Sequence, residues 1–99
     1  MRAGAAWLIL KRGHDAQRAF TAALAIAPDN AGAEMGLSMA ALMRSRPLEA
    51  EVPLRRVLAT DPANAAAWTL LADVLRRQGR GREADQAEAL VRRLGGVQA

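Results

Sequence analysis

The 99-residue sequence is poor in the residues that usually carry chemistry or cross-links. It has no cysteine and one histidine, His14, so it can form no disulfide bond and no metal site built on two histidines. It also lacks a Gly-rich phosphate loop, because Arg80-Gly81 and Gly95-Gly96 follow helical patterns and are interpreted as helix ends. We therefore expect no enzymatic activity, no bound metal and no cofactor.

Long apolar runs are missing as well, which argues against a membrane protein. The apolar run at residues 3–10 is far shorter than the roughly 18–20 apolar residues that a membrane-spanning helix needs. Lys11 and Arg12 follow it where a signal peptide would carry small residues for cleavage. We expect a cytoplasmic protein with no membrane partner. Thirteen of the fourteen basic residues are arginine, which is typical of a GC-rich bacterial genome.

What the chain does contain favours helices. Alanine makes up about a quarter of the residues, while β-branched and aromatic residues are few. Such a composition favours helix over strand and predicts an all-α fold. A chain of this length forms at most one domain with a modest core.

A repeated sequence segment shows how the chain is organised. LAIAPDNAGAE at residues 24–34 and LATDPANAAAW at residues 58–68 share six of eleven residues, and Pro28 and Pro62 are 34 residues apart. A fixed period of this size is the signature of stacked units that bury their apolar faces against one another. We predict one domain over residues 1–96, with units at about 1–30, 31–64 and 65–96 and a short tail at 97–99.

Each unit is expected to hold two helices, because apolar and small residues recur there by three and four. Asn30 and Asn64 are predicted N-caps, and Gly79 is a predicted helix end in the left-handed conformation. In the first unit, Gly13 is expected to close one helix and Asp15 to cap the next. The six predicted helices cover about residues 3–12, 16–27, 31–44, 47–60, 65–78 and 82–94.

Pro53 conflicts with this scheme, because it falls inside the helix predicted at 47–60. A proline there removes one backbone hydrogen bond and crowds the carbonyl of Glu49, at a cost of about 3 kcal/mol. The helix is expected to start late or to kink at this residue.

The pattern resembles the tetratricopeptide repeat (TPR) family, whose 34-residue unit is a helix–turn–helix. The residues that carry the resemblance are Trp68, Leu71, Ala72 and Leu75 in the third unit and Ala16, Phe20 and Pro28 in the first. The resemblance implies a superhelix of three antiparallel helix pairs, with a concave groove that typically binds a protein or peptide segment. The implied groove residues are Met35, Met39, Leu42, Met43, Thr69, Asp73, Arg76 and Arg77. The groove positions with which some members hold a C-terminal carboxylate carry Gly36, Ala66 and Leu70 here, so no such clamp is expected.

The three methionines of the groove recur every four residues and form one stripe on one helix face. Methionine suits surfaces that accept varied partners, although a stripe at this spacing can also be core. Gly36, between two of them, would leave a flat spot where another backbone could approach. With the polar residues of the third unit beside this stripe, the predicted ligand is a segment with apolar residues followed by acidic ones, and the predicted role is that of an adaptor.

Two other functions remain open. The net charge of +4 and the arginines at 55, 56, 76, 77, 80, 82, 92 and 93 fit a nucleic-acid partner, but acidic residues are interleaved and aromatic residues are only 3% of the chain, so no stacking platform exists. The four apolar residues at 7–10 wrap around a helix, which fits a homodimer, cover by a longer parent chain or an unusual packing.

Overall fold

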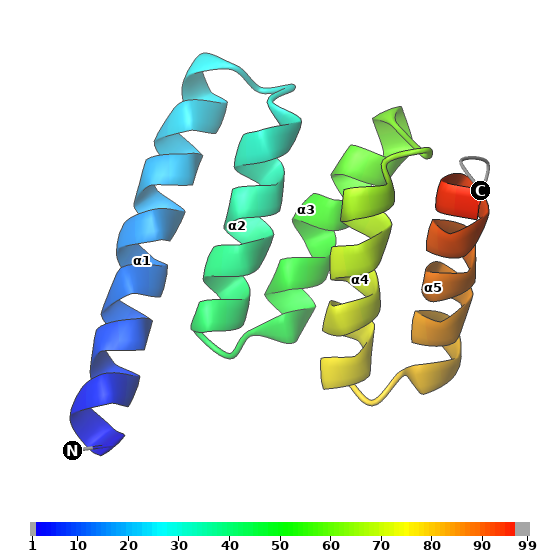
Figure 1. Ribbon diagram of the computed structural model, residues 1–99. Helices are drawn as coiled ribbons and strands as arrows, with labels where there is room; N and C mark the ends of the chain where they lie inside the picture. The colour runs from blue at the N-terminus through cyan, green and yellow to red at the C-terminus, as the bar shows by residue number, and fades with distance from the viewer. Residues whose placement is uncertain (1, 97–99) are drawn as a thin grey trace.

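The computed structural model describes the backbone of residues 2–96 and the side chains of residues 9–95. Within that part of the chain the regular structure is helical, which confirms the all-α prediction (Figure 1). The helices are α1 (Arg2–Ile26), α2 (Ala31–Met43), α3 (Pro47–Thr60), α4 (Ala65–Arg77) and α5 (Gly81–Gly96). The tail predicted at 97–99 lies outside the described residues.

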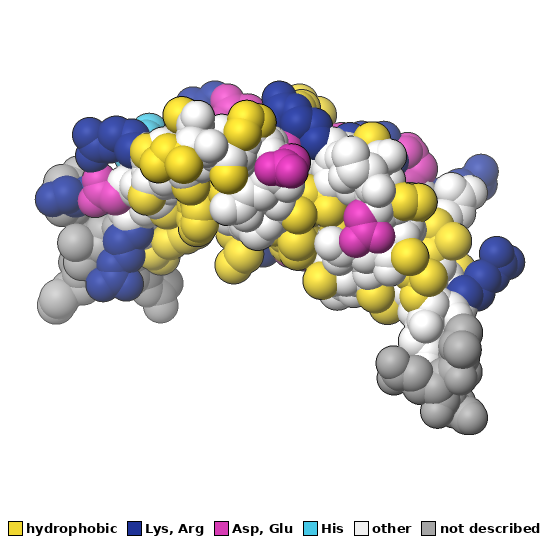
Figure 2. Space-filling model, turned by 90° about the horizontal axis from the view of Figure 1, so that it is seen from above, with side chains coloured by type: hydrophobic (Ala, Val, Ile, Leu, Met, Phe, Trp, Pro, Cys, Tyr) yellow, Lys and Arg dark blue, Asp and Glu magenta, His cyan; other side chains and the backbone are white. Residues whose placement is uncertain are grey.

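The helices stand side by side in one row, and consecutive helices run antiparallel (Figure 1). Each helix packs mainly against its neighbours in the chain. Seen from above, the row curves into an arch (Figure 2). The radius of gyration is 14.5 Å, above the value of about 13 Å for a compact domain of about 100 residues. The molecule is therefore a curved array of helices more than a rounded bundle.

The two turns that precede α2 and α4 have the same geometry. Asn30 and Asn64 are N-caps with φ and ψ of −74° and 98° in one case and −74° and 95° in the other. Each side-chain oxygen accepts a hydrogen bond from the backbone N–H three residues later, at 3.0 Å in both turns. The predicted N-caps are confirmed, and the backbone repeats with the 34-residue spacing of the sequence.

The ends of α2 and α4 match in the same way. The N–H groups of Arg46 and Arg80 donate to the carbonyl oxygens five residues earlier, at 2.8 Å and 2.9 Å. Each closing turn contains one residue at positive φ, Ser45 at 58° and Gly79 at 78°. Gly79 thus has the left-handed conformation that was predicted for it. Ser45 has the same conformation but carries a Cβ, which makes that conformation costly.

The core lies mainly between α3, α4 and α5. Its largest fully buried apolar side chains are Leu54, Leu71, Val74 and Leu75. Small buried alanines of α2 and α5 extend it on both sides, so the helices approach closely. In α1, by contrast, Gly13 is the single buried residue among the described side chains.

The predicted first helix pair is wrong, because residues 2–26 form the single helix α1. Gly13, the expected helix end, is buried where α1 passes α2. A Cβ there would lie 2.8 Å from Cγ of Arg44 and 3.1 Å from the carbonyl oxygen of Ala40. This glycine serves a close approach of two helices and not a chain reversal. Asp15, the expected N-cap, is exposed on the same helix and pairs with Arg18 at 2.6 Å.

The described part of the chain therefore has five helices and not six. The expected late start at Pro53 is also wrong, since α3 begins at Pro47 and runs through Pro53, which is buried. Pro47 is the first residue of the helix, where its missing N–H has no cost.

The apolar run at residues 7–10 lies in the first half of α1, which extends past the turn between α2 and α3 (Figure 1). Ile9 and Leu10 are exposed, and the side chains of Trp7 and Leu8 lie outside the described set. None of the helices in the described residues combines the length and the apolar character needed to cross a bilayer.

Candidate functional site

The methionine stripe of the predicted groove lies along α2. The side chain of Met39 is 55% exposed and that of Met43 is 36% exposed. Met35 and Leu42 are half-buried and pack against the core cluster. Two of the four predicted apolar contacts of α2 are therefore anchored and two are open, and Met39 is the most accessible of them.

Gly36 does not leave the flat, open spot that was expected between the methionines. It is buried, and the ring of Phe20 from α1 occupies the space beside it. A Cβ at Gly36 would lie 2.4–2.6 Å from three atoms of that ring. The glycine therefore accommodates α1, and no partner backbone has access to it.

The predicted groove residues of α4 are polar and are engaged with one another. The hydroxyl of Thr69 donates to the carbonyl of Ala65 at 2.9 Å. Arg77 pairs with Asp73 at 3.2 Å, one helical turn earlier. Arg76 reaches across to α5. It pairs there with Asp85 at 3.3 Å and also with Glu88.

A hollow of about 340 Å³ lies between α4 and α5 and brings three of the predicted residues together. It is lined by Thr69, Ala72, Asp73, Arg76, Glu88, Val91 and Arg92. Sequence reasoning missed the contribution of α5. Val91 was not predicted to belong to the groove, and Arg92 was considered only among the arginines of the nucleic-acid alternative. The available signal was the three-residue spacing of Glu88 and Val91, which places them on one helix face.

The charges in this hollow cancel. Asp73 and Glu88 oppose Arg76 and Arg92, and each arginine that sequence analysis assigned to the groove is already paired with a carboxylate. Arg92 makes no ion pair within the described residues. An acidic ligand residue would therefore find Arg92 free, whereas it would have to displace a carboxylate at Arg76 or Arg77.

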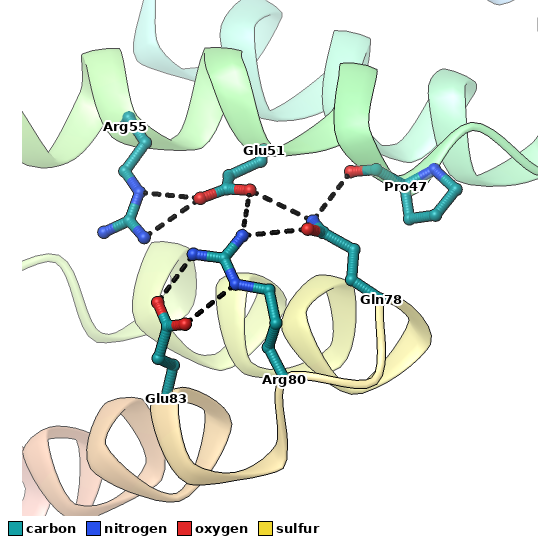
Figure 3. Close-up of polar contacts among 6 residues, drawn as sticks. All are labelled: Pro47, Glu51, Arg55, Gln78, Arg80 and Glu83. Atoms are coloured by element: carbon teal, nitrogen blue, oxygen red, sulfur yellow. Dashed lines mark hydrogen bonds and ion pairs between the residues drawn. The ribbon is translucent and has the colours of Figure 1, made fainter.

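A second polar cluster joins α3 to the turn between α4 and α5 (Figure 3). At its centre, the Glu51 carboxylate accepts hydrogen bonds from Arg80 at 2.8 Å, Gln78 at 3.0 Å and Arg55 at 3.0 Å. Arg80 also binds Glu83 at 2.6 Å. Gln78 donates in addition to the backbone carbonyl of Pro47, at 3.3 Å. We call these residues the Glu51 junction.

The hydrogen bonds of the junction stabilise its charged forms. Partial burial acts to raise the pKa of Glu51, but the hydrogen bonds it accepts, first that from Gln78, outweigh burial and hold this pKa below its ordinary value. The hydrogen bond from Arg80 likewise lowers the pKa of Glu83. The same bond raises the pKa of Arg80. The junction is fully ionised at neutral pH and holds two repeat units together.

The same ion pairs weaken the nucleic-acid interpretation. Arg55, Arg56, Arg76, Arg77 and Arg80 each pair with a carboxylate. Arginines at 82, 92 and 93 make no ion pair within the described part of the chain. A surface that attracts phosphates needs uncompensated positive charge, and most of the arginines in question are compensated.

Residues that could hold a metal ion do not gather anywhere in the described part of the chain. His14 is exposed on α1, between Gly13 and Asp15, where a turn between two helices was predicted. A scan against protein-family models gives no match, and a search of the curated proteins finds no relative.

Proposed function

We propose that this chain is a TPR-like interaction module whose concave face binds a segment of another protein. The observation that carries the proposal is the matched pair of turns before α2 and α4. They place Met39 and Asp73, which are 34 residues apart, at equivalent positions of equivalent helices. In a regular array such positions face the same side and form one continuous surface.

The side chains of that surface determine which residues a bound segment should carry. Met39 and Met43 supply exposed, adaptable apolar contacts, and the hollow between α4 and α5 supplies Arg92. The bound segment should therefore derive most of its affinity from apolar residues. An acidic residue should contribute mainly through Arg92. The role is that of an adaptor without enzymatic activity.

A pair of matched substitutions tests this proposal. Met39→Glu places a charge on the methionine stripe, and Leu48→Glu places the same charge on α3, where the Leu48 side chain is 70% exposed. The wild-type domain and both variants would be used as bait in a lysate of the source organism, with circular dichroism to show that each is folded. We expect a bound protein to be retained by the wild type and by Leu48→Glu and lost from Met39→Glu. Equal retention by all three would refute the proposal.

Self-association through the first half of α1 is a second candidate, favoured by the exposed Ile9 and Leu10. Against it, the charged residues among the first twelve are Arg2, Lys11 and Arg12, which are all basic. Antiparallel pairing of two such segments would bring like charges together. Sedimentation velocity at high concentration decides between the two functions, because the second requires a dimer that Leu10→Glu dissociates.

A further inference from the structure

Positions 34 and 68 are equivalent in the two matched turns but carry different residues. The N–H of Glu34 donates to the carbonyl of Asn30 at 3.1 Å, and that of Trp68 to the carbonyl of Asn64 at 3.2 Å. With the cap dihedrals also equal, the Cα–Cβ bonds of the two residues leave the backbone in the same direction. The backbone is the same at the two positions, and the residues they carry differ.

In the third unit this position is filled by an indole ring. Trp68 is half-buried and packs against the core cluster. Its Nε1–H donates to the backbone carbonyl of Pro62, in the turn before α4, at 2.8 Å. The indole therefore reaches from α4 back to that turn.

In the second unit this position carries a carboxylate in place of a ring. Glu34 is buried and its carboxylate faces Arg56 of α3, at 3.3 Å. A cleft of about 570 Å³, which we call the α2–α3 cleft, remains beside it. It is lined by Pro28, Asp29, Ala31, Glu34, Arg56, Val57 and Thr60. Its size is typical of a site for a small ligand or a large side chain.

The lining of the cleft matches the chemistry of indole. Pro28, Ala31 and Val57 present apolar surface, and the Pro28 carbonyl corresponds to the oxygen that binds Trp68 in the next unit. The Glu34 carboxylate offers a second acceptor for an N–H group. The Arg56 guanidinium, whose side chain is mostly exposed, can stack on an aromatic face.

We propose that the α2–α3 cleft binds a tryptophan side chain presented by a segment of a partner protein. The incoming indole takes the position that Trp68 takes in the third unit. Its N–H donates to the Pro28 carbonyl or to Glu34, and its face lies against Arg56. This site lies between the start of α2 and the end of α3 and does not include the methionine stripe.

A titration with single-residue probes tests the site directly. The isotope-labelled full chain would be titrated with N-acetyl-tryptophanamide and followed by its backbone amide resonances. We expect saturable shifts at Ala31, Val57 and Thr60. N-acetyl-leucinamide should bind about three to ten times more weakly, since it lacks the aromatic and cation–π contributions. N-acetyl-lysinamide tests the alternative occupant, a cation that would bind to Asp29 and Glu34.

Variants then locate the binding. Glu34→Trp fills the cleft from within and should abolish the shifts, at least a tenfold loss. The matched Leu48→Trp, at an exposed residue of α3 outside the cleft lining, leaves the cleft open and should retain them. Ala31→Phe, at the exposed first position of α2, blocks the cleft if Glu34→Trp does not fold. The proposal is overturned if the tryptophan probe does not saturate, if the lysine probe binds more tightly, or if neither blocking variant reduces binding.

Discussion

Replacing Gly36 by alanine tests how α1 is held on the array. In an unconstrained helix interior the change would stabilise by about 1 kcal/mol, because glycine costs that much relative to alanine. Here the new Cβ would lie 2.4–2.6 Å from three atoms of the Phe20 ring, so the ring must move. The ring is half-buried and can swing outward, which sacrifices part of the roughly 1.5–3 kcal/mol that a buried Phe contributes.

Displacement and overpacking together cost about 2–3 kcal/mol, and the gain in helix propensity offsets about 1 kcal/mol. We therefore expect Gly36→Ala to lower the free energy of unfolding by about 1–2 kcal/mol, measured by urea denaturation. Gly81→Ala is the control, because a Cβ at Gly81 would meet nothing within 4 Å. That variant should be neutral or slightly stabilised.

A double-mutant cycle with Phe20→Leu isolates the contact. Once the ring is shortened, Gly36→Ala should lose its penalty, so the coupling energy between the two positions should reach about 1 kcal/mol or more. If Gly36→Ala destabilises equally with Phe or Leu at position 20, the Phe20 ring is not the cause. If Gly36→Ala is as stable as the wild type, the packing of α1 on α2 inferred here is wrong.

Four further substitutions have defined outcomes. Ser45→Gly should raise the free energy of unfolding by about 1 kcal/mol, because it removes a Cβ from a residue in the left-handed region. Gly79→Ala should lower the free energy of unfolding, because it adds a Cβ to a residue in that region. Thermal denaturation measures both changes. Asn64→Ala should cost about 1 kcal/mol in urea denaturation, through loss of the N-cap bond to α4. Because the pKa of Glu51 is lowered in the folded protein, the contribution of Glu51 to stability is full above its ordinary pKa of 4.5 and is lost as the pH falls through the lower folded value. Glu51→Gln should therefore flatten the fall in stability below about pH 4, and an unchanged acid profile would contradict the role of the Glu51 junction.

The parts of the fold that the sequence predicted are those determined locally. Asn30, Asn64 and Gly79 act within one turn of their own backbone, so their residue types suffice to place the starts of α2 and α4 and the end of α4. The error at Gly13 has a different cause. Glycine both ends helices and permits close helix packing, and the choice here depends on Arg44 and Ala40 of another helix.

The candidate site also has features that one helix determines and features that depend on contacts between helices. The spacing of the stripe placed the three methionines on one helix face but left open whether that face is core or surface, and in the structure Met39 is exposed. The pairing of Arg76 with α5 and the loss of access at Gly36 depend on contacts across helices, which one sequence cannot specify. The sequence does contain a signal for the α2–α3 cleft, because Glu34 occupies the position that corresponds to Trp68 in the other repeat.

The position of α1 has a kinetic consequence. Among the described side chains it contributes one buried residue, Gly13, and it packs against α2 at the edge of the row. Because contacts are formed between chain neighbours, the contact order is low and folding should be fast and should propagate along the row. Local unfolding should start at α1, because it has the fewest buried residues within the part of the chain that the structure describes. The amide hydrogens of α1 should therefore exchange with solvent well before those of α4. Local unfolding would thus begin at the α1 end of the array. Each time α1 detaches, the face of α2 around Gly36, which Phe20 otherwise covers, would be briefly exposed to solvent.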